Sequence, residues 1–93
     1  MVKPILELDA AEIAAIARVE AQRSFAGDGY QHWDVFLYSL AHDRPLAHES
    51  PALSEEPGEL TGYIDHYLAR VGLRRSTELD GQRETLSARV EQV

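Results

Sequence analysis

The chain has 93 residues, a formal net charge of −7 and no cysteine. With 44% hydrophobic and 27% charged residues, it is typical of one small globular domain rather than a disordered segment. The composition excludes a disulfide framework and a thiolate zinc site, and no apolar run approaches the roughly 20 residues that cross a membrane. The N-terminus lacks a signal-peptide layout, so we expect a single cytoplasmic domain over residues 1–93.

The negative charge is unevenly distributed along the chain. Residues 1–69 carry four basic residues against twelve acidic ones, whereas residues 70–93 carry five basic residues against four acidic ones. Nonspecific nucleic-acid binding depends on neutralising phosphates, so an acidic body makes nucleic acid a poor candidate ligand. The same charge favours solubility and the attraction of a partner with a basic surface.

The N-terminal third predicts one helix. Residues 2–8 are apolar and fit either a strand or a lead-in to that helix. Asp9 and Glu12 have the spacing of a capping box, which predicts a helix over about residues 9–24. On such a helix Ile13, Ile16 and Val19 share a narrow apolar face.

An aromatic segment follows, and it contains the only tryptophan of the chain. On a helix over about residues 30–43, Tyr30, Trp33 and Leu37 fall on one face, with Asp34 at its border. Aromatic side chains bury large apolar areas, so we expect Trp33 to be buried and this helix to be the centre of the domain. Pro45 ends the helix, because the residue before a proline avoids the helical conformation.

Residues 44–58 form the only long loop-like segment, and it is acidic. Pro45, Pro51 and Pro57 recur every six residues, which fits neither a long helix nor a central strand. Loops of this length in compact domains are commonly functional. We therefore treat this proline-punctuated loop as a candidate interaction site.

The next segment is clearly amphipathic. Leu60, Ile64 and Leu68 lie on one face of a helix over residues 58–71. Gly72 follows as a C-terminal stop. The segment predicts the third helix of the domain.

The C-terminal tail fits two structures. As a hairpin it has strands at 73–79 and 82–92 and turns at Asp80-Gly81, a favoured two-residue pair. As a helix it aligns Leu79, Leu86 and Val90 on one face. We favour the hairpin. The predicted fold is then α+β and mostly helical, with three helices and the hairpin, to which residues 2–8 add a third strand if they are extended; the alternative is an all-α four-helix domain.

No pattern in the chain predicts catalysis. The four histidines lack metal-ligand spacing, and no serine stands in a nucleophile elbow. We accordingly predict no catalytic residue, no cofactor and no metal ligand. The preferred hypothesis is a non-enzymatic protein that binds and modulates another macromolecule, such as an inhibitor, an antitoxin-like partner or a phage-type anti-defence factor.

The binding hypothesis assigns recognition to the acidic loop and the helix after it. The partner is expected to be a protein with a basic surface, and a homodimer is left open. The predicted partner-binding residues are Glu49, Glu55, Glu56, Glu59, Tyr63 and Tyr67.

Two other hypotheses rank below this one. One is an accessory subunit or small enzyme with a site around Asp34, Tyr30 and Tyr38, in which Asp34 is the functional acid. The other is a helix-turn-helix DNA binder with Arg74 and Arg75 on phosphates. The acidic body and a spacing one residue too short before Gly72 argue against DNA binding.

Overall fold

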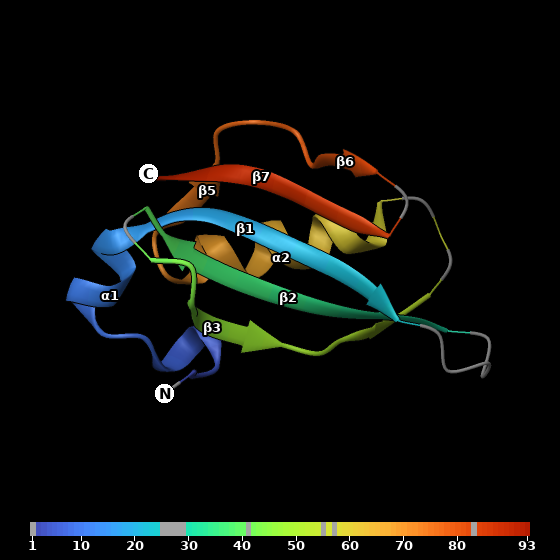
Figure 1. Ribbon diagram of the computed structural model, residues 1–93, viewed down its shortest axis with the longest axis horizontal. Helices are drawn as coiled ribbons and strands as arrows, with labels where there is room; N and C mark the ends of the chain where they lie inside the picture. The colour runs from blue at the N-terminus through green and yellow to red at the C-terminus, as the bar shows by residue number, and fades with distance from the viewer. Residues whose placement is uncertain (1, 25–29, 41, 55, 57, 83) are drawn as a thin grey trace.

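The computed structural model describes residues 2–24, 30–40, 42–54, 56, 58–82 and 84–93. Its helical elements are η1 (Ile5–Glu7), α1 (Ala10–Ala15) and α2 (Glu59–Arg70). Its strands are β1 (Ile16–Ser24), β2 (Gln31–Ser39), β3 (Pro45–Glu49), β4 (Ala52–Leu53), β5 (Leu73–Arg75), β6 (Asp80–Gln82) and β7 (Thr85–Gln92). Figure 1 shows the sheet in front of α2, with α1 at the end where β1 begins.

The strands form an antiparallel sheet in the order β3-β2-β1-β7-β5, with β4 also paired to β2 and β6 also paired to β7. Each edge of the sheet is therefore an interrupted strand, β3 with β4 on one side and β5 with β6 on the other. Short, broken edges offer little template for pairing with another chain. On the β3 edge, the backbone of Lys3 also bonds to Leu46 and His48.

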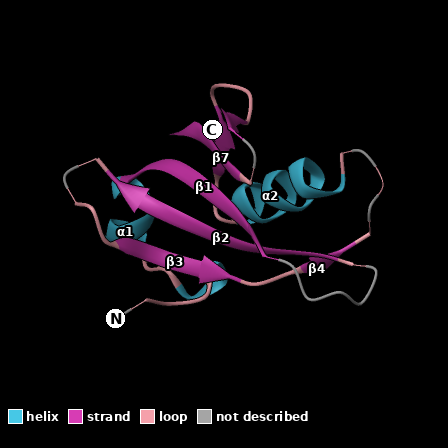
Figure 2. Ribbon diagram, turned by 45° about the vertical axis from the view of Figure 1, so that its right-hand side comes forward, coloured by secondary structure: helices cyan, strands magenta, loops and turns pink. Residues whose placement is uncertain are grey.

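The hydrophobic core lies between the sheet and α2, whose Leu60, Ile64 and Leu68 side chains are buried. The remaining buried apolar core residues are Ile5, Leu8, Ile16, Val19, Ala21, Trp33, Val35, Leu37, Ala47, Leu73, Ala88 and Val90. Figure 2 shows α2 packed along one side of the sheet. No helix among the described residues covers the opposite side, which we call the open face of the sheet.

The predicted mostly helical fold is wrong, and the first helix shows why. The capping box of Asp9 and Glu12 is present, but α1 ends at Ala15 and the chain continues as β1. A register shift between Ile16 and Arg18 places an irregularity at the start of the strand. An extra residue interrupts the period-two pattern of a strand. The buried Ile16 and Val19 are consequently three residues apart, a spacing that also fits a helix.

The predicted aromatic helix is also wrong, because residues 31–39 form β2. Trp33 is buried, as expected, but it alternates with Val35 and Leu37 along a strand. Tyr30, which the predicted helix would have placed on its apolar face, is 58% exposed. Large side chains at every second position fit both a helix and a strand. The segment forms a strand because it pairs with β1 and β3.

Two other segments also differ from their predicted structures. The proline-punctuated loop contains β3 and β4, and Pro45 is tolerated because β3 is an edge strand. Of the two structures considered for residues 2–8, the strand is not formed: Lys3 makes one isolated parallel bridge to Ala47, and η1 then leads into α1. Strand β3 lies at the edge of the sheet, which agrees with the prediction that residues 44–58 contain no central strand.

Helix α2 is confirmed within one residue at each end, and Gly72 follows it with a left-handed φ of 77°. The tail is extended rather than helical, so the four-helix alternative is wrong. The predicted turn at Asp80-Gly81 is wrong as well. Both residues belong to β6, where Asp80 pairs with Ser87 and Gln82 with Thr85, so the chain reverses between Gln82 and Thr85.

Candidate functional site

A groove opens between the β4 segment and the first turns of α2. It has a volume of about 380 Å³ and is lined by Leu53, Glu56, Gly58, Glu59, Gly62, Tyr63 and His66. We call these residues, with the neighbouring Glu49, the acidic groove. The first turn of α2, which forms one wall of the groove, lies on the right of Figure 1.

Local sequence explains the shape of the acidic groove. Gly58 caps α2 with a left-handed φ of 87°, a conformation that other residues adopt at a cost. Glu59 lies in the first turn, where the positive end of the helix dipole stabilises a carboxylate, and it accepts a 2.9 Å hydrogen bond from the Ser54 hydroxyl. Gly62 has no side chain, so the helix surface beside Tyr63 stays open.

The acidic groove has a negatively charged surface. The pKa of Tyr63 is raised to about 12. The largest cause is burial of the phenol, followed by the charge of Glu49 and then by Tyr67. Within the described part of the chain, no lysine or arginine forms an ion pair with Glu49, Glu56 or Glu59. The groove therefore presents carboxylates whose charge is open to an external cation.

The structure brings most of the predicted partner-binding residues together. Glu56, Glu59 and Tyr63 line the groove, and Glu49 is close enough to act on Tyr63. The Tyr67 ring packs against that of Tyr63 at 4.7 Å between centroids. Glu55, the sixth predicted residue, lies outside the described residues.

Asp34 lies on the open face in a second polar cluster, which sequence reasoning missed. Its Oδ1 atom is 2.9 Å from His48 Nε2 and accepts a 2.8 Å hydrogen bond from the Ser50 hydroxyl. The Ser50 Oγ atom is also 3.1 Å from His48 Nε2. The His48 ring stacks on Phe36 at 4.7 Å. Hydrogen bonds from His48 and Ser50 hold the pKa of Asp34 below its usual value.

This cluster contains aspartate, histidine and serine, but its geometry is not that of a nucleophilic relay. In a relay one ring nitrogen of the histidine faces the acid and the other faces the nucleophile. Here the same His48 nitrogen faces both, and the Ser50 hydroxyl donates to the carboxylate. The arrangement joins the end of β3 to β2 and leaves the serine without a base.

Asp34 is not grouped with the tyrosines of the enzyme hypothesis. Tyr30 precedes β2 and is largely exposed. Tyr38 is four residues along the same strand, roughly 13 Å from Asp34 at the usual rise of a strand. Its ring is covered instead by the Arg18 guanidinium, 4.0 Å from the ring centroid. Period-two alternation from Asp34 to Tyr38 is the sequence signal that places these side chains on one face.

The basic residues after α2 have partners within the chain. Arg75 makes two hydrogen bonds to the Asp65 carboxylate, at 2.6 and 2.9 Å, and Arg74 is 3.4 Å from Glu91. The segment that contains them is β5 rather than a second helix. It therefore does not supply the recognition helix that the DNA-binding hypothesis needs.

The described residues include no group of three or more histidine, aspartate or glutamate side chains placed to hold a metal ion. In the same part of the chain, no helix has the length and apolar character needed to cross a membrane.

Comparisons with protein-family models, curated proteins and solved structures find no match. The acidic groove is thus the candidate site on its geometry and charge alone.

Proposed function

We propose that this protein is a non-enzymatic, cytoplasmic binding protein that modulates a protein partner by taking a basic segment of it into the acidic groove. One observation carries the proposal: Glu49, Glu56 and Glu59 gather around the half-buried Tyr63, and no lysine or arginine among the described residues pairs with them. An inhibitor, an antitoxin-like partner or a phage-type anti-defence factor would each act in this way.

The physical argument is one of charge compensation. Carboxylates held near one another repel, and an arriving lysine or arginine relieves that repulsion while gaining charge-assisted hydrogen bonds. The rings of Tyr63 and Tyr67 add surfaces over which a cation is attracted. The net charge of −7 also steers a basic partner during diffusion, which raises the association rate at low salt.

Affinity capture from a native extract tests the proposal. The bait is the wild-type protein, compared with a groove variant that carries Glu49→Gln, Glu56→Gln and Glu59→Gln. A control variant with Glu7→Gln, Asp43→Asn and Glu84→Gln loses the same charge at exposed positions outside the groove. We expect one stoichiometric partner with the wild type and the control, and strong loss of that partner with the groove variant.

The captured partner then has to bind directly. Purified partner should bind the wild type with an affinity that falls as salt rises, because the contact is between opposite charges. Equal binding by the groove variant and the control variant would overturn the assignment of the site. Absence of any stoichiometric partner, with a catalytic turnover found instead, would overturn the binding function.

A further inference from the structure

Two arginines face each other on the open face of the sheet. Arg18 of β1 pairs directly with Arg89 of β7, and the neighbouring pair of Val19 and Ala88 is buried on the other side. Directly opposed like charges destabilise a strand pair. The strand register thus places two arginines opposite each other at a position where an opposite charge would be the stabilising choice.

Neither guanidinium has an acidic partner in the described part of the chain. Arg18 lies over the Tyr38 ring, and its Nε atom is buried without a hydrogen-bond partner. Arg89 makes hydrogen bonds through its backbone, whose N–H donates to Thr77 Oγ1 and whose carbonyl accepts from the Ser76 N–H, and among the described residues its guanidinium makes none. Arg18 is partly buried and Arg89 is exposed, so the cost of a guanidinium atom without an acceptor falls on Arg18, and a bound anion would offset it.

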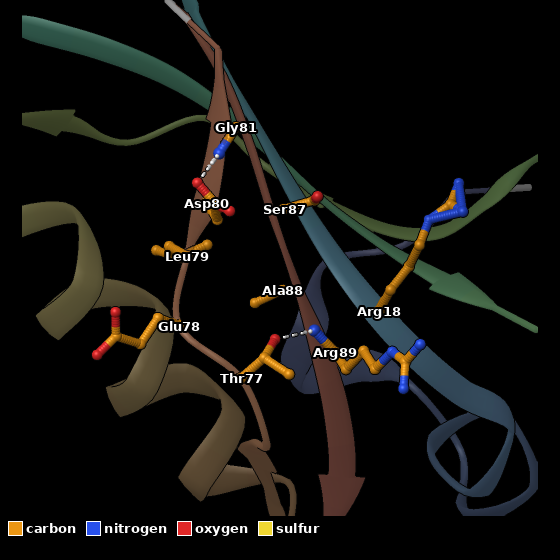
Figure 3. A pocket seen from close by; sticks show the side chains of 9 residues that line it. All are labelled: Arg18, Thr77, Glu78, Leu79, Asp80, Gly81, Ser87, Ala88 and Arg89. Atoms are coloured by element: carbon orange, nitrogen blue, oxygen red, sulfur yellow. Dashed lines mark hydrogen bonds between the residues drawn. The ribbon is translucent and has the colours of Figure 1, made fainter.

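The two arginines separate two depressions of different character. The first, of about 620 Å³, runs along the segment before β6 and includes Glu78 and Asp80, as Figure 3 shows. In Figure 3 the Arg18 and Arg89 side chains extend away from Leu79 and Asp80. The two carboxylates of the first depression would repel an anion.

The second depression, of about 460 Å³, contains no acidic residue. We call it the arginine pocket, and it is lined by Ala17, Arg18, Ser39, Leu40, Ser76, Arg89 and Val90. Its walls combine two cations, two hydroxyl groups and an apolar part in which Leu40 is 91% exposed. This combination suits an anion that is attached to an apolar body.

We propose that the arginine pocket binds a phosphate monoester carried on an apolar or aromatic body. A monoester carries a charge of about −1.5 to −2 at neutral pH, which matches two guanidinium groups better than a single carboxylate does. Guanidinium groups also fit phosphate oxygens with paired hydrogen bonds. The Ser76 hydroxyl supplies a further donor, and the exposed Leu40 contacts the body of the ligand. The pocket is separate from the acidic groove, so this inference does not depend on the proposed function.

Titration with small probes tests the pocket on the purified protein. The probes are phenyl phosphate, benzoate and inorganic phosphate, followed by calorimetry and by backbone amide shifts. We expect saturable binding of phenyl phosphate with shifts centred on Arg18, Leu40 and Arg89, and weaker binding of the other two probes. Benzoate binding as tight as phenyl phosphate would overturn the choice of a dianion. Equal binding of inorganic phosphate would overturn the role of the apolar wall.

Matched variants identify the residues responsible. Removing one charge-assisted contact with Arg89→Gln should weaken phenyl phosphate about tenfold, whereas Arg70→Gln on the exposed surface of α2 should leave it unchanged. Arg18→Lys keeps the charge but loses the paired donors, so it should weaken binding while the fold is retained. Equal affinity of the Arg89→Gln and Arg70→Gln variants, or no saturable binding by the wild type, would overturn the proposal.

Discussion

Glu49 of β3 and Tyr63 of α2 are electrostatically coupled where the edge of the sheet meets the helix. Burial of the phenol is the larger effect and the Glu49 charge the next, and together with Tyr67 they raise the pKa of Tyr63 to about 12. The coupling joins a residue of an edge strand to a residue of the only long helix among the described residues. It therefore makes the chemistry of the groove sensitive to how β3 and α2 are packed.

The Tyr63 pKa predicts a loss of stability at alkaline pH. An unfolded tyrosine ionises near pH 10, so between about pH 10 and 12 the unfolded state has lost a proton that the folded state keeps. The stability that this proton provides is complete below pH 10 and falls as pH rises through the folded pKa. We expect Tyr63→Phe to reduce this fall in urea unfolding measured from pH 9 to 11.5. An unchanged pH slope would contradict the coupling.

The Asp34 cluster predicts an opposite dependence at acid pH. Hydrogen bonds from His48 and Ser50 lower the pKa of Asp34 in the folded protein. The stability that these hydrogen bonds provide is therefore present above the unfolded pKa, which is near 4. It is lost as the pH falls through the folded pKa. Ser50→Ala should lower stability at pH 7 and have a smaller effect in strong acid. The test is urea unfolding at pH 7, 4.5 and 3, with carboxyl NMR titration of Asp34.

Ser87→Ala is the control for the acid experiment. Ser87 lies exposed on β7 and makes none of the Asp34 contacts. Its variant should follow the wild-type pH profile. If Ser50→Ala and Ser87→Ala behave alike, the hydrogen bond to Asp34 contributes nothing to folding.

Two glycines provide a paired prediction with opposite signs. A methyl group at Gly62, exposed within α2, would contact no heavy atom, so Gly62→Ala should stabilise the protein by about 0.5–1 kcal/mol. A methyl group at Gly81 would collide with the backbone carbonyl oxygen of Thr85 in the β6–β7 pair, so Gly81→Ala should be destabilising. Chemical denaturation of the two variants measures both effects. Equal stability changes would contradict the β6–β7 register.

The parts of the fold that follow from local sequence were predictable. The capping box of Asp9 depends on residues three apart, and the face of Leu60, Ile64 and Leu68 depends on one turn of helix. Both signals are complete within a few residues. The groove was largely predictable for the same reason, since its acids and Tyr63 lie within fifteen residues of one another along the chain.

The sheet was not predictable because its pairing joins distant segments. The alternation of Trp33, Val35 and Leu37 competed with an equally plausible helical pattern, and the irregularity near Ile16 disguised β1. A contact between residues far apart requires the register of two strands to be known. This is why neither the His48–Asp34 bond nor the pair of Arg18 and Arg89 could be found from the sequence.

The acidic groove predicts that its charges serve binding rather than folding. In the Glu49→Gln, Glu56→Gln, Glu59→Gln variant, the loss of the favourable helix-dipole contact of Glu59 is offset by relief of repulsion. The free energy of unfolding should therefore stay within about 1 kcal/mol of the wild-type value. Urea unfolding at low and high salt should also show a smaller salt effect than in the wild type, because screening acts on the charges that were removed. The control variant at Glu7, Asp43 and Glu84 should keep the salt dependence that its remaining groove charges produce.

With a partner available, stopped-flow mixing should show a slower association and a flatter salt slope for the groove variant alone. A groove variant that unfolds easily, or that associates at the wild-type rate, would show that these carboxylates hold the fold together or face away from the partner.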